Sequence, residues 1–199
     1  ERIQQEEMSV PYKDNGYYYY TRYEEGKEYP VYSRKKNLED AEEEILLNAN
    51  EMAAGCSYFH VSNFGLSISP NNKLMAFGYD TTGSYGSLKF KDLATGKWLK
   101  DEIPNTTGDP VWANDNKTVF YSIPDTLGRS FKVKKHSLGE NPENDKIVFH
   151  EKDAGFDIYV YKSKSKKYII IRSLSTLSLE YLVLNADNPS GDFKIIQPR

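Results

Sequence analysis

Two serines in this chain follow a glycine at the spacing of a hydrolytic nucleophile. In one large class of hydrolases the serine stands in G-x-S-x-G, where a sharp turn exposes its hydroxyl. Residues 65–69 and 128–132 begin with this pattern but lack the second glycine. The sequence therefore predicts no catalytic serine of this kind.

The three histidines could act as general bases or metal ligands, so their spacing matters. A metal site needs several ligands that converge on one ion, but His60, His136 and His150 have no partners at such a spacing, and Cys56 is the only cysteine. His136 falls on the polar phase of the alternating run 131–136, which predicts a solvated strand residue. We expect no catalytic residue, no metal site and no cofactor in this chain.

Two further features suggest ligand binding but have simpler explanations. Residues 78–86 contain three glycines, yet they do not form G-x-G-x-x-G between a strand and a helix, so a hairpin turn is favoured over a phosphate loop. The run Tyr17–Tyr20 could form a ligand platform. Tyrosines at both phases of a strand more often lie buried between two packed sheets, and we favour that interpretation.

An acidic stretch at 24–28 contains Glu24, Glu25 and Glu28. The simpler interpretation is a solvated hairpin turn. The functional interpretation is a substrate rim that attracts basic peptides, which would act on the rate of encounter more than on affinity. Both interpretations remain open at the level of the sequence.

The elements that carry these residues follow from an internal repeat. Each copy is a polar turn of the Asn/Asp/Ser type that leads into an apolar strand. Successive copies are separated by 44 and then 50 residues, measured between Lys73, Lys117 and Lys167. The copies span 69–77, 113–121 and 162–171, with a fainter one at 14–20.

Each copy is followed by two more strands and their turns, which makes about four short strands in about 45 residues. This is the period of a β-propeller blade. The fold class is therefore predicted as all-β, with four-stranded antiparallel blades. We expect an acidic loop that leads to an edge strand at 38–47 and one helical turn at 48–52. The approximate blades are 9–48, 57–104, 108–151 and 156–198.

Composition excludes several classes of protein. The chain has 199 residues, a net charge of −3, one cysteine and 16 tyrosines, and tyrosine favours strands. There is no apolar run long enough for a transmembrane helix, no visible signal peptide, and no charge excess that would favour nucleic acid. We expect a cytoplasmic protein, or a periplasmic one if a preceding segment carries a signal. Since the chain does not begin with Met, we expect it to be processed or part of something longer.

Several longer strings resemble the oligopeptidase B branch (protease II) of the prolyl oligopeptidase family of serine peptidases. The resemblance covers essentially the whole chain. In the hairpin at Gly83–Ser87 the family usually has charged or polar residues, often Arg or Glu, where this chain has small ones. The strings that carry the resemblance are Ser9–Tyr12, Gly16–Pro30, Ser69–Asn71, Asp92–Gly96, Val111–Tyr121, His136–Gly139, Glu151–Asp153 and Asp187–Phe193.

The resemblance implies a seven-bladed propeller that covers an α/β-hydrolase domain with a Ser-Asp-His triad. It implies cleavage after Arg and Lys, and a propeller that admits only short, unstructured peptides. No triad residue can be assigned here, because the chain reaches Arg199 before any hydrolase segment. Residues 1–199 are thus expected to be a partial propeller of about four blades, inactive alone. Its expected partners are short basic peptides and its own hydrolase domain, with no nucleic acid or membrane.

A protein-interaction module is the alternative, in which four blades close into a ring. If instead the blades form an open arc, the exposed faces of the terminal blades should promote self-association.

Overall fold

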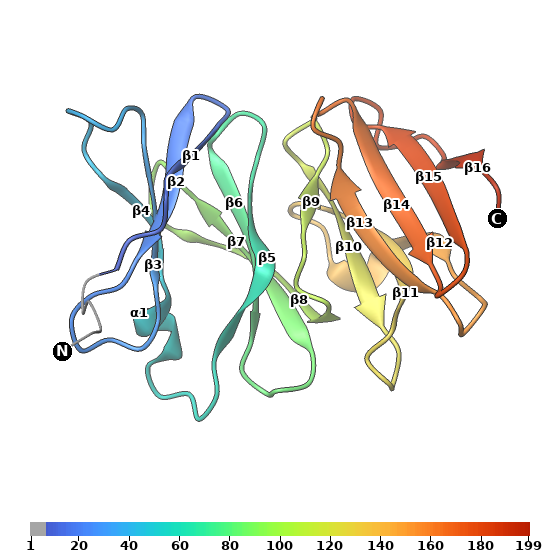
Figure 1. The fold of residues 1–199 in the computed structure, drawn as a ribbon, viewed down its shortest axis with the longest axis horizontal. Helices are drawn as coiled ribbons and strands as arrows, with labels where there is room; N and C mark the ends of the chain where they lie inside the picture. Colours follow the sequence, from blue (N-terminus) through green and yellow to red (C-terminus); the bar gives the residue numbers. More distant parts are fainter. Residues whose placement is uncertain (1–6) are drawn as a thin grey trace. The chain divides into compact units, whose positions relative to one another are not determined.

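The computed structural model describes residues 7–199, apart from the side chains of residues 63–65. The chain forms two compact units, residues 1–59 and 60–199 (Figure 1). Each unit is described by itself below.

The first unit holds sheet 1, an antiparallel sheet with the strand order β1-β2-β3-β4. Helix α1 follows its last strand directly, which confirms the expected helical turn. Asn48 caps α1 by accepting a hydrogen bond from the Asn50 amide. The acidic loop and edge strand expected at 38–47 are confirmed by β4. The elements are β1 (Tyr12–Asp14), β2 (Tyr17–Arg22), β3 (Val31–Lys35), β4 (Glu44–Asn48) and α1 (Ala49–Ala53).

The tyrosine run lies on β2, and its burial is uneven. Tyr19 and Tyr20 are buried, whereas Tyr17 and Tyr18 are only half-buried. Tyr19 stacks on Tyr12 of the neighbouring strand, with ring centroids 5.6 Å apart. The expectation that tyrosines fill both faces of the strand therefore holds for the second half of the run and is wrong for the first half.

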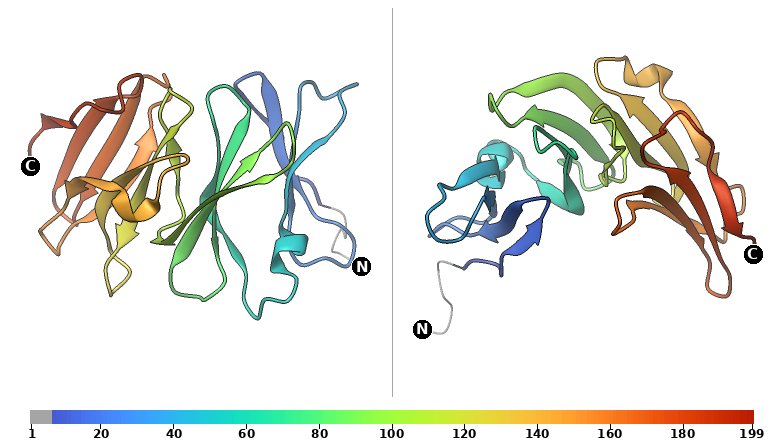
Figure 2. Two further views of the ribbon diagram at one scale, coloured as in Figure 1. Left: turned by 180° about the vertical axis from the view of Figure 1, so that it is seen from behind. Right: turned by 90° about the horizontal axis from the view of Figure 1, so that it is seen from above.

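The second unit contains three four-stranded antiparallel sheets, each in sequence order. We call them sheet 2 (β5–β8), sheet 3 (β9–β12) and sheet 4 (β13–β16). Figure 2 shows them side by side in that order. With sheet 1, the structure confirms an all-β fold of four-stranded sheets. The strands are β5 (His60–Ile68), β6 (Leu74–Asp80), β7 (Gly86–Asp92), β8 (Trp98–Thr106), β9 (Val111–Trp112), β10 (Thr118–Pro124), β11 (Ser130–Ser137), β12 (Lys146–His150), β13 (Asp157–Lys162), β14 (Tyr168–Leu174), β15 (Leu179–Asn185) and β16 (Lys194–Gln197), with a short 3-10 helix, η1 (Pro142–Asn144).

The repeated turns have one backbone feature in common. In each turn, the residue two positions before the strand has a positive φ. These residues are Asn72 at 62°, Asn116 at 58° and Lys166 at 60°. Asparagine tolerates this left-handed conformation better than other residues that carry a Cβ. The repeat seen in the sequence therefore marks the turn between the first two strands of each sheet.

The repeated turns also join neighbouring sheets. The Asn116 side chain accepts a hydrogen bond from the Asn71 amide at 2.7 Å, and the Asn114 side chain donates to the Lys166 carbonyl at 3.1 Å. One end of the second unit is thus held by hydrogen bonds that run from turn to turn.

The 2/3 interface, where sheet 2 packs on sheet 3, contains a buried ionic cluster. His136 on β11 is fully buried. Its Nδ1 lies 2.9 Å from Asp145, and its Nε2 lies 3.0 Å from Asp101 on β8. Each ring nitrogen of His136 thus lies within hydrogen-bond distance of a carboxylate. Tyr121 also donates a hydrogen bond to the cluster, to Asp145 at 2.8 Å, and the Gly139 amide donates to Asp101 at 2.6 Å.

The expectation of a solvated His136 is therefore wrong. The residue does lie on a strand, but sheet 2 covers the face that the alternating pattern marked as polar. Phe90 of β7 stacks on the imidazole, with centroids 5.8 Å apart. A single-strand pattern cannot reveal such a neighbour, because Asp101 lies 35 residues earlier in the chain.

The 3/4 interface, where sheet 3 packs on sheet 4, has an apolar core. This core is a continuous layer of aliphatic side chains in which Phe120 is buried, with Phe149 and Phe193 packed against it. These core residues include Val111, Phe120, Val133, Ile158, Ile169, Ile171, Leu182 and Leu184.

Candidate functional site

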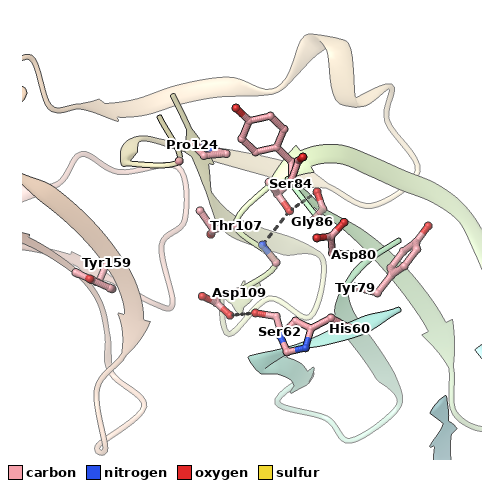
Figure 3. Close-up of a pocket in the computed structure, with 14 residues that line it drawn as sticks. His60, Ser62, Tyr79, Asp80, Ser84, Gly86, Thr107, Asp109, Pro124 and Tyr159 are labelled. Carbon is pink, nitrogen blue, oxygen red and sulfur yellow. Dashed lines mark hydrogen bonds between the residues drawn. The ribbon is translucent and has the colours of Figure 1, made fainter. Parts of the chain in front are cut away.

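A cavity of about 400 Å³ opens at one end of the second unit (Figure 3). It lies where β5 begins, β6 and β8 end, and the β6–β7 and β10–β11 hairpins turn. This is the end opposite the repeated turns. The residues used in the argument below are Ser62, Asp80, Tyr85, Asp109 and Tyr159.

The floor of the cavity is the connector 105–110, which leads from sheet 2 to sheet 3. It passes so close to β6 that a Cβ on Gly78 would lie 1.7 Å from the carbonyl oxygen of Gly108. Gly108 itself has a φ of +84°, a conformation that favours glycine. These two glycines therefore allow the connector to lie against β6 and bring Asp109 into the cavity.

Hydrogen bonds hold the connector in place. The Thr107 amide donates to the Ser122 carbonyl at 3.1 Å, and the Gly108 amide donates to the Thr106 hydroxyl at 3.0 Å. Ser62 on β5 donates its hydroxyl to Asp109 at 2.6 Å (Figure 3). These bonds therefore tie the connector to sheets 2 and 3.

Asp80, at the end of β6, is the second carboxylate of the cavity. One of its oxygens, Oδ1, accepts three hydrogen bonds from the hairpin: from the Thr82 amide at 2.7 Å, the Thr82 hydroxyl at 2.9 Å and the Gly83 amide at 3.1 Å. This is an Asx-type turn, in which the side chain of the first residue stabilises the loop. The loop thus fixes the Asp80 side chain through a single oxygen.

Tyrosines provide most of the apolar wall. Tyr85 donates its hydroxyl to the Asp125 carbonyl of the β10–β11 hairpin at 3.2 Å. Tyr159 of β13 is half-exposed, and the Arg172 guanidinium stands over its ring at 4.7 Å. These contacts fix the cavity wall between elements of three sheets.

The acidic rim predicted at 24–28 lies in the β2–β3 hairpin of the first unit. Glu24 forms a 2.9 Å ion pair with Arg22, while Glu25 and Glu28 are exposed. Arg22 also hydrogen-bonds to Glu43, which lowers the pKa of that carboxyl. Two of the three predicted rim residues therefore present their charge to solvent, and their role stays a prediction.

The histidines and the cysteine do not form a catalytic arrangement in the described part of the chain. His60 lines the cavity, and His150 packs edge-to-face on Phe131 at 5.5 Å. Across residues 7–199, no hydrogen bond joins a histidine to a described serine hydroxyl or to Cys56. The described residues also contain no group of three His, Cys, Asp or Glu side chains able to hold a metal ion. Within the same residues, no helix is long and apolar enough to cross a membrane.

The comparison with protein families decides the assignment. The model of the prolyl oligopeptidase N-terminal β-propeller domain matches residues 1–199, the entire chain. The chain belongs to this family. Its sheets are therefore blades of that propeller domain, and the resemblance seen in the sequence is confirmed.

Individual relatives agree with the family. Dipeptidyl aminopeptidase BI of Pseudoxanthomonas mexicana is 35% identical over 100% of this chain and 29% of its own length. Protease 2 of Moraxella lacunata is 31% identical over 100% of this chain and 30% of its own length. Oligopeptidase B from Leishmania major has a similar structure, with a TM-score of 0.90 and 28% identity over 99% of this chain and 28% of that one. The chain thus spans about three tenths of the length of these relatives.

Sequence reasoning missed the cavity. Asp80 and Asp109 are 29 residues apart in the sequence, and both line the cavity only because the connector returns across β6. The available signal was the set of glycines at 78, 86 and 108. Those at 78–86 were interpreted as a hairpin turn, and Gly108 was not considered. The small residues at Gly83–Ser87, noted as a departure from the family, supply part of the cavity wall through Ser84, Tyr85 and Gly86.

Proposed function

We propose that this chain is the propeller portion of a serine oligopeptidase of the oligopeptidase B type. The catalytic triad would belong to a hydrolase domain in the same longer protein, acting by acyl transfer with serine as nucleophile and histidine as base. The propeller would limit access to short, unstructured peptides, and cleavage would follow Arg or Lys. The chain alone would be inactive.

One observation carries this proposal: the propeller-domain model of this peptidase family matches the chain from end to end. Relatives named Protease 2 and oligopeptidase B support the type of peptidase. The arrangement of His136 supports the absence of catalysis in the chain itself. Both of its ring nitrogens face carboxylates in a fully buried site, so a substrate cannot reach the ring.

The proposal also gives a role to the exposed glutamates of the acidic rim at 24–28. Glu25 and Glu28 would raise the rate at which basic peptides are captured, since exposed charge steers encounter. Neutralising both residues should slow capture of an arginine peptide at low salt and leave capture of a neutral peptide unchanged. An unchanged salt dependence of the capture rate would exclude the rim from this role.

The test compares the 199-residue chain with the longer protein that contains it, using an arginine-containing chromogenic peptide. The longer protein should hydrolyse the peptide, and an inhibitor that acylates serine peptidases should stop the reaction. The purified chain should show no hydrolysis above buffer. Hydrolysis by the chain, once contaminating peptidases are excluded, would contradict the proposal. A longer protein without a hydrolase segment would favour the interaction module instead.

A further inference from the structure

The outward face of sheet 4, which points away from sheet 3, is rich in aromatic side chains. Successive residues of a strand point to opposite faces of its sheet. On β13, Ile158 and Val160 are buried against sheet 3, so Tyr159 and Tyr161 lie on the outward face. A contiguous apolar patch of this kind is suited to packing against another surface. The exposed apolar residues of this face are Tyr159, Tyr161, Tyr168 and Leu179, each between 38% and 48% exposed.

Arg172 on β14 stands in the middle of the outward face. It pairs across the sheet with Tyr159 on one side and Tyr181 on the other, and its guanidinium lies 4.7 Å from the centre of the Tyr159 ring. Within residues 7–199, its buried Nε has no hydrogen-bond partner. Asp157, the acidic residue of the same face on β13, stands opposite Leu174. The chain therefore leaves the Arg172 guanidinium among aromatic rings with incomplete hydrogen bonding.

The charge of Arg172 restricts what can cover this face. An arginine side chain stays protonated in proteins, and a buried charge without a partner is strongly unfavourable. An apolar surface laid over Arg172 would displace water from the guanidinium and supply no acceptor. A carboxylate is the best match, because it can accept two parallel hydrogen bonds from the guanidinium. A surface that covers the outward face should therefore present a carboxylate to Arg172.

The 2/3 interface shows the same arrangement within the described fold. His136 of sheet 3 is fully buried, and Asp101 of sheet 2 lies 3.0 Å from its Nε2. A polar group in the middle of one sheet is thus matched by a carboxylate from the neighbouring sheet. We expect the outward face of sheet 4 to be completed in the same way.

The packing order of the second unit identifies what covers the face. Sheet 3 packs on sheet 2, and sheet 4 packs on sheet 3, so each sheet covers the one before it in the sequence (Figure 2). The chain spans only 29% and 30% of two relatives, which leaves room for a further sheet in a longer protein. A second copy of this chain is disfavoured, because a symmetric pair centred on this face would bring one Arg172 toward the other, and like charges repel.

We propose that a further sheet of the longer protein covers the outward face of sheet 4, and that a carboxylate on that sheet pairs with the Arg172 guanidinium. The proposal rests on the proposed function for the existence of the longer protein. The pair fixes the register of the two sheets, because it forms only where the carboxylate lies opposite Arg172.

The first measurement compares the 199-residue chain with the longer protein that contains it. N-acetylimidazole acetylates accessible tyrosine hydroxyls, and mass spectrometry gives the rate at each residue. We expect Tyr159 and Tyr161 to react at least about tenfold more slowly in the longer protein, because a packed interface excludes the reagent. Unfolding both proteins in urea should remove the difference.

Variants of the longer protein test the charge. Arg172→Glu sets a carboxylate against the expected carboxylate, so the interface should open and acetylation of Tyr159 should become at least about tenfold faster. Arg172→Lys keeps the charge and should change the rate by less than about threefold. Lys167→Glu, at an exposed position of the β13–β14 hairpin, is the matched charge reversal and should change it by less than about twofold. In the 199-residue chain, Arg172→Glu should keep the circular dichroism spectrum of the wild type, which excludes misfolding of the sheet.

Cross-linking identifies the partner of Arg172. A carbodiimide joins an amine to a carboxylate in contact with it, so it is applied to the longer protein with Arg172→Lys. The expected cross-link joins position 172 to an Asp or Glu within one repeat, about 45 residues, after β16.

The outcomes separate this proposal from its alternatives. Equal acetylation of Tyr159 in Arg172→Glu and in the wild type would overturn it, and so would a cross-link to a carboxylate within this chain or in a hydrolase segment. Protection that disappears when the longer protein is diluted would identify a second copy as the occupant and would also overturn it. If the longer protein cleaves arginine peptides while Tyr159 reacts as fast as in the chain, this proposal fails and the proposed function stands. If Tyr159 is protected through Arg172 but no peptide is cleaved, the proposed function fails and this proposal stands.

Discussion

The two interfaces of the second unit join similar blades with different chemistry. At the 2/3 interface, His136 stands between Asp101 and Asp145, and a cavity opens beside the connector. At the 3/4 interface, aliphatic side chains such as Ile169, Ile171 and Leu184 form the core. The buried carboxylate there, Glu151, stands in the connector between the sheets, where it accepts a hydrogen bond from Ser173 and pairs with Arg199. The repeat sets the shape of each blade, whereas the chemistry between blades is particular to each pair.

The difference has a physical consequence. An apolar interface is non-directional, and it tolerates changes that preserve volume and hydrophobicity. An ionic cluster requires specific geometry, because each buried charge needs its partner. We therefore expect the 2/3 interface to fix the register of its two blades more strictly than the 3/4 interface does. Removing one partner should also lower the unfolding free energy more at the 2/3 interface.

The largest expected effect is at the ionic cluster. His136→Leu leaves the carboxylates of Asp101 and Asp145 buried and without their hydrogen bonds to the imidazole, which should cost about 3–5 kcal/mol of unfolding free energy. Urea denaturation checks this value. Lys146→Leu, at the exposed start of β12 in the same sheet, is the control and should change stability by less than about 0.5 kcal/mol. A loss below about 1 kcal/mol at His136 would show that the cluster does not hold the interface.

The 3/4 interface should respond mildly to a change that keeps it apolar. Ile171 is fully buried there, and Ile171→Val removes one methylene, which should cost about 0.5–1.5 kcal/mol. The same denaturation experiment measures it. A cost as large as that of His136→Leu would mean that the two interfaces do not differ in tolerance.

The pH dependence of stability tests the buried carboxylate of Glu151, in the connector between sheets 3 and 4. Burial alone would raise the pKa of Glu151, but hydrogen bonds from Ser173, the Asp153 amide and Arg199 outweigh it, and the pKa is lowered below the ordinary 4.5. A lowered pKa stabilises the fold above the unfolded-state value, and this stability is lost as the pH falls through the folded-state value.

Glu151→Gln should therefore reduce stability at pH 7 and flatten its decline below about pH 4.5. Thermal unfolding from pH 7 to pH 3 provides the test. Glu140→Gln, an exposed residue on the turn after β11, should leave the profile unchanged. Parallel profiles for the wild-type chain and Glu151→Gln would contradict this account of the connector.

The smallest expected effect concerns the repeated turns. Lys166 has a φ of 60° where the matching turns have Asn72 and Asn116. Lys166→Asn should raise stability by about 0.5 kcal/mol, since asparagine is less strained in this conformation. Lys164→Asn, in the same turn, should have no such effect. Destabilisation by Lys166→Asn would show that the lysine side chain contributes more than the backbone strain costs.

The repeat made the fold predictable, because turn chemistry and alternation are local properties of the sequence. The four-stranded sheets, the helical turn at Ala49–Ala53 and the strand that follows each Asn-rich turn were all open to prediction. His136 and the cavity were not, because they depend on contacts between blades. Asp101 approaches His136, and Asp109 reaches the cavity of Asp80, only once sheets 2 and 3 pack together. Position in a strand defines a face, but the neighbouring sheet decides whether that face meets solvent.

The most direct test of the central claim is the size selectivity of the longer protein that contains this propeller. It should be given an arginine peptide of about ten residues, and the same sequence displayed in a loop of a folded protein. The account predicts efficient cleavage of the free peptide and no detectable cleavage of the folded protein under the same conditions. Cleavage of both at similar rates would contradict a role for the propeller in limiting access to the active site.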